Sequence, residues 1–312
     1  MVNKILSLGE LLVEVMRPGI DQPLTDAGQF LGPYPSGAPA IFIDAAARLG
    51  CSTGFAGVVG ADDFGVCIVN RLQRDRVDTT MVRVMEGLTT GIAFVAYRGD
   101  GSRTFVFHLK QSAAADLGVE DLLEEDFRRA AWVHITGSTL SFSDRARQAC
   151  YRAIDLCKAG GGKVCFDPNL RPELLGIEGL RAVVEPVLRS CDVLFPSGAE
   201  AALLTGEENS EKACRALVER GIPIVALKQG EKGSTVYTRG EALHIESLPV
   251  KEVDPTGAGD CFDAGFITGL LEGWDLGRVA RFANVVGALS VTRQGPMEGA
   301  PDRAEVFRWM AG

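Results

Sequence analysis

Short apolar segments alternate along this chain with longer segments in which apolar residues recur every three to four positions. The first kind predicts buried β-strands, and the second predicts amphipathic α-helices. Buried strands that are separated from one another by helices are typical of a mainly parallel sheet with helices on both faces. We therefore predict a doubly wound α/β fold. The strands are expected at 5–8, 54–59, 132–135, 163–166, 193–195 and 224–227, and the helices at 38–49, 64–74, 143–158, 178–190, 209–220, 258–272, 276–292 and 302–310.

Two segments, 11–34 and 89–110, interrupt this alternation because they lack a helical period and contain alternating or β-rich runs. The second segment indicates a β-hairpin whose turn is the run 98–102, Arg-Gly-Asp-Gly-Ser. We predict that the two segments form a small β-sheet lid outside the main core, within a single domain that spans residues 1–312. The alternative is that they only extend the main sheet.

The charge of the chain limits its partners. The 32 Lys and Arg residues against 41 Asp and Glu residues give a net charge of −9. Because there is no basic surplus to displace counterions, neither nucleic acid nor an anionic membrane is an expected partner. The eight cysteines are scattered without a C-x-x-C pair, which favours reduced, buried thiols. The apolar runs are too short for a membrane span or a secretory signal, so we expect a soluble, cytoplasmic protein.

The segment 254–260, Asp-Pro-Thr-Gly-Ala-Gly-Asp, carries the clearest chemical signal. Its small residues let a ligand approach the backbone, and the apolar spacing that follows predicts a helix. The N–H groups of Gly257, Ala258 and Gly259, with the positive end of the helix dipole, form an anion site. Asp260 beside that site suits a base that takes a proton from a hydroxyl attacking a bound phosphoryl group. An aspartate in this place can also serve only as a helix cap.

Polar residues follow three of the predicted strands. Asp167, Ser197 and Lys228 each fall just after a predicted strand. Because ligands bind beyond the carboxyl ends of the strands in open α/β sheets, we expect these residues to line one edge together with Asp260. The sequence has neither a P-loop motif nor a G-x-G-x-x-G run after the first strand, so those modes of nucleotide binding are not indicated.

Several segments resemble, in the same order, the signatures of the ribokinase-like (pfkB-type) carbohydrate kinases. The run 254–262 is similar to the C-terminal signature of that family, and 36–50 followed by 59–65 is similar to its first signature. The resemblance covers the whole chain. It implies a doubly wound α/β core with a β lid, ATP and Mg²⁺ as cofactors, a small sugar as substrate, and a homodimer, since such lid sheets often pair between subunits. Further similar runs are 167–171, 197–200, 227–233 and 283–288.

The resemblance implies a role for each residue of the anion site and for the ATP contacts. Asp260 matches the catalytic base that removes the proton of a primary sugar hydroxyl. The residues that match the anion hole, which stabilises the transferring phosphoryl group, are Gly257, Ala258 and Gly259. The residues that match contacts to the nucleotide are Ser197, Lys228, Gly230, Gly233 and Asn284.

Metal and sugar contacts follow in the same way. Glu200 matches an acid that organises the water shell of Mg²⁺, although Ser197 stands where relatives carry Asn. Asp254 and Thr256 match positions near a monovalent cation site, which implies K⁺ as a further ion. The residues that match sugar contacts are Glu14, Gly37, Asn169, Arg171 and Lys110, with Ser138 as a weaker match.

The exact substrate stays open at this point. The runs 9–13 and 293–300 are similar to 2-keto-3-deoxygluconate kinases and to ketohexose kinases that act on fructose or tagatose. Ile41 stands where relatives often carry an Asn that binds sugar hydroxyls, and Leu109 or Lys110 stands where sugar-acid kinases carry an Arg. The missing Arg argues against a carboxylate substrate, whereas the run 293–300 argues for one.

Two other functions are compatible with the same segments. A nucleoside kinase of this family would need a pocket for a planar base, and the aromatic content of 7% disfavours it. A sugar-binding regulator without catalytic activity would have no need of Asp260, the anion hole or Glu200.

Overall fold

The computed structural model describes residues 4–170 and 172–311. Its main sheet has the strand order β13-β12-β11-β10-β9-β8-β1-β4-β5. All neighbours from β11 to β5 are parallel, whereas β12 pairs antiparallel with both β11 and β13. The bounds are β1 Lys4–Leu8, β4 Ser52–Gly60, β5 Asp78–Met85, β8 Trp132–Thr136, β9 Lys163–Asp167, β10 Val193–Leu194, β11 Ile224–Lys228, β12 Ser234–Tyr237 and β13 Ala242–Ile245.

The direction in which the chain adds strands reverses at β1. After β1 it adds β4 and then β5 on one side, and it later adds β8, β9, β10 and β11 on the other side. A reversal of this kind leaves a crevice beyond the carboxyl ends of the two strands that flank it, here β1 and β8. The fold therefore determines where a ligand can bind before any side chain is considered.

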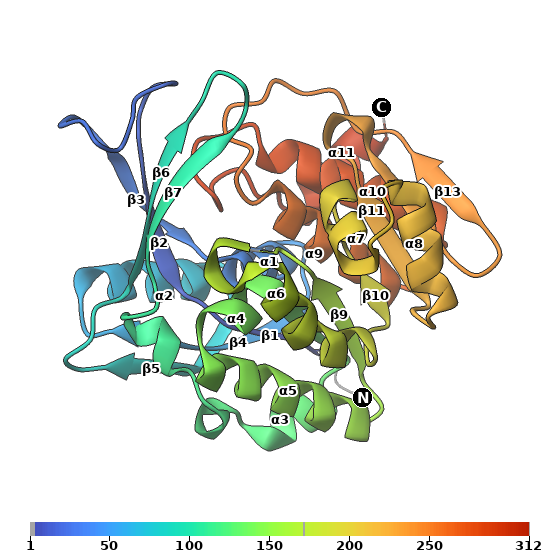
Figure 1. Ribbon diagram of the computed structural model, residues 1–312, viewed down its shortest axis with the longest axis horizontal. Helices are drawn as coiled ribbons and strands as arrows, with labels where there is room; N and C mark the ends of the chain where they lie inside the picture. The colour runs from blue at the N-terminus through green and yellow to red at the C-terminus, as the bar shows by residue number, and fades with distance from the viewer. Residues whose placement is uncertain (1–3, 171, 312) are drawn as a thin grey trace.

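Helices cover both faces of the main sheet (Figure 1). Successive residues of a strand point to opposite faces, so Leu6 of β1 packs in one apolar core and Ile5 in the other. The core around Leu6 includes α5 Asp144–Ala159, α6 Pro172–Leu188 and α8 Ser210–Glu219. The core around Ile5 includes α1 Ala38–Arg48, α2 Asp63–Arg74, α9 Ala258–Leu271, α10 Leu276–Ser290 and α11 Arg303–Met310. None of the helices in the described residues has the length and apolar character needed to cross a membrane.

A second, smaller sheet has the strand order β3-β2-β6-β7. Figure 1 shows it standing apart from the main sheet, at the upper left of the view. The strands β6 and β7 form the predicted antiparallel hairpin, in which Tyr97 pairs with Arg103. The predicted fold class, a doubly wound α/β sheet with a separate small sheet, is confirmed. The bounds are β2 Leu12–Met16, β3 Leu31–Ser36, β6 Gly91–Tyr97 and β7 Arg103–His108.

Several elements were not predicted. The edge strand β5 is mostly half-buried and therefore lacks a continuous apolar run, while β12 and β13 are only four residues long each. Helix α6 begins at Pro172 instead of 178 and is interrupted at Gly176, whose backbone is not helical. The remaining unpredicted elements are α3 Glu124–Arg129, α4 Gly137–Phe142 and α7 Gly198–Thr205, with the 3₁₀ turns η1 Ala113–Asp116, η2 Val119–Asp121 and η3 Gly230–Lys232.

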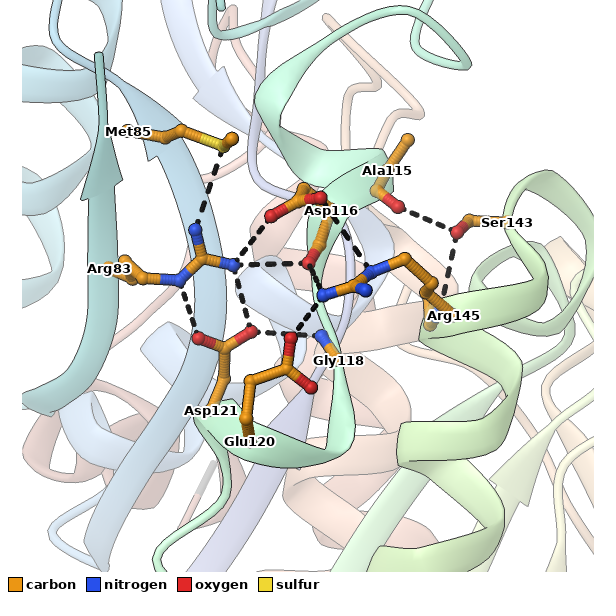
Figure 2. Close-up of polar contacts among 10 residues, drawn as sticks. Arg83, Met85, Ala115, Asp116, Gly118, Glu120, Asp121, Ser143 and Arg145 are labelled. Carbon is orange, nitrogen blue, oxygen red and sulfur yellow. Dashed lines mark hydrogen bonds and ion pairs between the residues drawn. The ribbon is translucent and has the colours of Figure 1, made fainter.

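An ion-pair network fixes the chain where it returns from the small sheet (Figure 2). Arg83 of β5 donates from Nε to Asp121 at 2.6 Å and from Nη2 to Asp116 at 2.9 Å. Arg145 of α5 pairs with Asp116 at 3.6 Å and also contacts Glu120. The network joins β5, η1, η2 and α5, and it anchors the segment that follows β7. The side chain of Asp121 is only 5% exposed, so its charge depends on these partners.

We expect Arg83→Met to lower the free energy of unfolding by about 1 to 2 kcal/mol, because the nearly buried Asp121 loses its charged partner. Urea denaturation measures the change. Arg129→Met is the control, because Arg129 pairs with Glu125 where both side chains are well exposed. That control should change the free energy of unfolding by no more than about 0.5 kcal/mol. Equal losses in the two variants would contradict the assigned role of Arg83.

His134 of β8 is completely buried in the core. Its ring stacks on Phe42 with the ring centroids 3.7 Å apart, and its Nδ1 lies 3.0 Å from Ser7 Oγ. Burial lowers the pKa of His134 to about 3. The ring is therefore neutral in the folded chain at neutral pH, and we interpret it as a core residue.

The depressed pKa of His134 predicts that stability falls with acid. An unfolded histidine titrates near about 6.5. Below that pH the unfolded chain binds a proton that the folded chain excludes, so this contribution is complete above pH 6.5 and is lost as the pH falls toward 3. Between pH 7.5 and 5.5 the loss should be about 1.4 kcal/mol. Urea denaturation at both pH values should show a change that is about 1.4 kcal/mol less favourable in the wild type than in His134→Gln, because Asp44, whose pKa is raised to about 7 by burial, titrates in the same range in both proteins. The matched control, His108→Gln at an exposed position, should keep the wild-type difference.

Candidate active site

A cavity of about 300 Å³ lies between the small sheet and the carboxyl ends of the main strands. It sits at the reversal between β1 and β8, and its wall takes residues from both sheets and from the start of α9. The strand-end residues Asp167, Ser197 and Lys228 therefore lie at one edge of the sheet together with Asp260, as expected. The predicted site residues that line this first cavity are Glu14, Gly37, Ser138, Asn169, Ser197, Glu200, Lys228, Gly257, Ala258, Gly259 and Asp260.

The turn that leads into α9 builds the anion site. Gly257 is the N-cap of α9 and has a φ of 82°. A Cβ atom at this position would lie 2.5 Å from the carbonyl oxygen of Pro296, so both the backbone angle and the space require glycine. The first N–H groups of a helix have no acceptor within the helix, and with the dipole they attract an anion. Asp260, in the first turn and 8% exposed, lines the cavity beside them.

A second cavity of about 580 Å³ adjoins the first. Lys228, Ala258 and Gly259 line both cavities, so the two spaces meet at the start of α9. The amide of Asn284 donates to the carbonyl oxygens of residues 245 and 246 at 2.9 and 3.1 Å, which holds the wall of the second cavity in place. Two adjoining cavities suit two ligands whose reacting groups meet at the shared wall. The predicted nucleotide contacts that line the second cavity are Lys228, Gly230, Gly233 and Asn284.

Two buried glutamates line the first cavity and not the second. Glu10 is 3% exposed and Glu14 is 6% exposed. Glu10 accepts hydrogen bonds from Ser138 Oγ and Thr139 Oγ1, each at 2.6 Å, and Glu14 accepts one from Ser36 Oγ at 2.7 Å. A carboxylate has about four acceptor positions, so both groups can also accept from ligand hydroxyls. Glu10 was not predicted as a site residue, although its position just after β1 was a usable signal.

The small sheet supplies a further wall that the sequence reasoning missed. Arg103, Phe105 and Phe107 alternate along β7, share one face, and line the first cavity. The two phenyl rings are stacked with their centroids 5.2 Å apart. Arg103 Nη1 donates to Thr256 Oγ1 at 3.2 Å, which links the small sheet to the turn before the anion site. Alternation along a strand was visible in the sequence, but it could not tell which face would meet the cavity.

Lys228 is held between two carboxylates. Its Nζ lies 3.0 Å from Asp167 Oδ2 and 3.3 Å from Asp263 Oδ2. Burial by itself would lower the pKa of Lys228, but these carboxylates raise it above its ordinary value, so the ammonium stays charged. Burial also raises the pKa of Asp263 well above its ordinary value. No sequence pattern singled out Asp263, because it lies on the buried face of a predicted helix.

Glu200 is the predicted metal contact in the first cavity. Its Oε2 accepts from the Ser197 N–H at 2.8 Å and its Oε1 from the Leu170 N–H at 3.0 Å. Within residues 4–170 and 172–311, no group of three or more His, Cys, Asp and Glu side chains could hold a metal ion. Magnesium keeps several waters and is commonly bound by one or two carboxylates plus substrate phosphates. One carboxylate in the cavity wall, that of Glu200, fits a Mg²⁺ ion that enters with a nucleotide.

Two predicted site residues are placed differently, and a third is not described. Lys110 is exposed and does not line the cavity, whereas its neighbour Leu109 does, so the predicted substrate contact is not supported. Arg171 lies outside the described residues. Asp254 is 1% exposed, lines neither cavity, and is saturated by hydrogen bonds, which favours a structural role over the predicted cation contact. Its donors are Tyr97 Oη at 2.8 Å, the Thr256 N–H at 3.0 Å, Gln294 Nε2 at 3.2 Å and the Gly295 N–H at 2.9 Å.

A doubly wound sheet, an anion site with an adjacent acid, and two cavities that share a wall define a phosphotransferase for a small hydroxyl-bearing acceptor. The family model for the pfkB family carbohydrate kinases matches residues 2–303. The chain belongs to this family, and it is a carbohydrate kinase, as the resemblance implied.

The relatives agree with this assignment. The Escherichia coli fructokinase is 33% identical over 98% of this chain and 99% of its own length. The E. coli protein named "putative Ribokinase II", solved in complex with ATP and Mg²⁺, is 41% identical with a TM-score of 0.93, covering 99% of each chain. The Vibrio cholerae fructokinase, solved with fructose, ADP and a calcium ion, is 30% identical with a TM-score of 0.87, covering 98% of each chain.

Proposed function

We propose that this carbohydrate kinase uses ATP and Mg²⁺ to phosphorylate the primary hydroxyl of a ketohexose such as fructose. The observation that carries the choice of a neutral sugar is the pair of buried glutamates, Glu10 and Glu14, in the first cavity. A sugar acid would bring a further negative charge beside them, whereas sugar hydroxyls donate hydrogen bonds to carboxylates. Leu109 lines the same cavity at the position where sugar-acid kinases carry an Arg, which supports this choice, while Arg103 of the small sheet, which also lines the cavity, donates to Thr256 Oγ1. The similarity to two fructokinases supports it as well.

The second cavity is the proposed ATP site. It opens onto the anion site through the wall shared with the first cavity, so the γ-phosphoryl group would lie at the start of α9. Glu200 is the proposed contact to the water shell of Mg²⁺. When bound, Mg²⁺ would offset negative charge on the phosphates.

In the proposed reaction, Asp260 takes the proton from the hydroxymethyl group of the sugar. The sugar oxygen forms a bond to the γ-phosphorus, the bond from that phosphorus to the bridging oxygen breaks, and ADP leaves with the electron pair. The N–H groups at 257–259 stabilise the charge on the transferring group. The small sheet, which places Arg103, Phe105 and Phe107 over the cavity, is the proposed lid that excludes water and so limits ATP hydrolysis.

The test is an ADP-release assay with MgATP and a panel of fructose, tagatose, 2-keto-3-deoxygluconate and ribose. We expect the highest kcat/KM with a ketohexose. Glu14→Gln should raise the KM for that sugar by about tenfold, because a charged acceptor of a sugar hydroxyl is lost. Glu14→Gln should also lower the ratio of kcat/KM for the ketohexose to kcat/KM for the keto acid, since it removes one negative charge from the cavity. A wild-type preference for the keto acid, or no turnover of any sugar by a protein that binds ATP, would contradict the proposal.

One observation favours a second candidate substrate, a riboside that carries a planar base. Phe105 and Phe107 are stacked and line the first cavity, where they offer an aromatic surface. The low aromatic content of the whole chain disfavoured this function, but the fold concentrates two of the rings at the site. Adenosine added to the panel distinguishes the two candidates, because a riboside kinase would turn it over faster than the ketohexoses.

A further inference from the structure

Asp263 is a buried carboxylate that the proposed reaction does not use. It lies one helical turn after Asp260 on α9, has no exposed surface, and lines neither cavity. Its Oδ1 accepts no hydrogen bond from the residues that the structure describes. Burying a carboxyl group without full hydrogen bonding costs free energy. The chain nevertheless places Asp263 within 3.3 Å of Lys228 Nζ.

The position of Lys228 explains why the chain keeps the contact between Asp263 and Lys228 despite its cost in free energy. Lys228 is the last residue of β11 and lines both cavities. Its Nζ would lie only 3.2 Å from a Cβ atom built at Gly259, so the ammonium is next to the backbone of the anion site. An ammonium group has three N–H donors. Asp167 and Asp263 accept two of them, and no other acceptor of Lys228 is found in residues 4–170 and 172–311, so the third is available to a ligand.

We propose that Asp263 is a positioning residue that holds the Lys228 ammonium at the shared wall of the two cavities, where it binds the phosphoryl group in transfer. The inference rests on the proposed function. Asp167 follows β9 and Asp263 belongs to α9, so the two carboxylates fix the ammonium from two different elements. A lysine side chain is long and flexible, and a single partner would leave it several positions. A charge fixed in advance where negative charge develops lowers the barrier more than a mobile one.

Nucleotide binding tests the proposal without knowledge of the sugar. Calorimetry compares ADP with a non-hydrolysable ATP analogue for the wild type, Asp263→Asn and Lys228→Met. Because the ammonium acts at the transferring group, both variants should weaken binding of the ATP analogue by about fivefold or more and change ADP binding by less than about twofold. Equal weakening of both nucleotides, or no weakening of either, would overturn the proposal.

A double-mutant cycle then separates positioning from a general effect on the fold. With the preferred sugar, Asp263→Asn should lower kcat by about tenfold or more while the KM for that sugar is nearly unchanged. In the Lys228→Met background the same substitution should change kcat by less than about twofold, because the group that it positions is gone. An equal loss of kcat in the wild-type and Lys228→Met backgrounds would contradict the positioning role, and so would full activity of Asp263→Asn.

Asp44→Asn is the matched control for loss of a buried carboxylate. Asp44 is also unexposed and pairs with a cation, Arg71, at 2.9 Å, but it lines neither cavity. It should keep the wild-type kcat per folded molecule.

If Asp263→Asn does not fold, Lys228→Arg tests the proposal instead. A guanidinium carries the same charge in a different shape, so the kcat of Lys228→Arg should stay below that of the wild type. Wild-type kcat in Lys228→Arg would refute the need for a positioned ammonium. Failure of the proposed function looks different, since the wild type itself would then prefer the keto acid or phosphorylate no sugar.

Discussion

Asp260→Asn is expected to lower kcat by a factor of about 10² to 10⁴, the usual contribution of a positioned general base. Asn keeps the shape of the side chain but cannot take the proton of the attacking hydroxyl. The KM values for sugar and ATP should change little, because the loss falls on the transition state. The ADP-release assay measures both constants with the sugar that the panel identifies.

The competing interpretation of Asp260 is that it only complements the dipole of α9. In that case Asp260→Asn would cost about 0.3 to 1 kcal/mol of stability and leave kcat unchanged. Asp63→Asn is the matched control, because Asp63 is an exposed acid in the first turn of α2. A wild-type kcat in Asp260→Asn, with the same small change in melting temperature as Asp63→Asn, would show that Asp260 is not the base.

Gly257→Ala is expected to lower kcat by a factor of about 10² to 10³, because the anion hole loses its geometry. The added Cβ would lie 2.5 Å from the Pro296 carbonyl oxygen and 3.1 Å from Ile41 Cγ2, so the turn must shift. The N–H groups of Ala258 and Gly259 shift with it. ADP-release kinetics, normalised to the fraction of protein that binds nucleotide, separates this loss from unfolding.

Gly273→Ala is the control for Gly257→Ala at the other end of α9. Gly273 has a φ of 71°, close to the 82° of Gly257, but nothing lies within 4 Å of its Cβ position. It should cost about 1 kcal/mol of stability from the unfavourable backbone angle and leave kcat unchanged. Similar losses of kcat in the two variants would mean that backbone strain in α9, and not the collision at the anion hole, controls the activity.

The sequence could predict the parts of the fold that depend on strong local patterns. The central strands are apolar throughout because both of their faces are buried, so their positions were correct, as were those of the long helices except the start of α6. The parallel order then placed Asp167, Ser197 and Lys228 at one edge of the sheet, near Asp260. The edge strand β5 and the short β12 and β13 were missed because exposure and shortness weaken the same pattern.

The sequence could not show which face of each strand or helix lies against the cavity or against another element. Phe105 and Phe107 lie on an alternating strand whose cavity face is chosen by the docking of the small sheet. Asp263 looked like any buried helical position until its contact with Lys228 was seen. The choice between Leu109 and Lys110 depended on a gap that only the structure placed. The roles of the site residues, the single-domain assignment and the homodimer stay predictions, and each can be measured.

The first cavity draws its walls from nearly the whole length of the chain, from Glu10 after the first strand to Asp260 in the ninth helix. Contacts between residues so distant in sequence form late in folding, because long loops must close before such contacts can stabilise the chain. During refolding, helical content should therefore return before catalytic competence does. Turnover in this protein reports the completion of folding, because no partly folded portion of the chain contains both walls of the cavity.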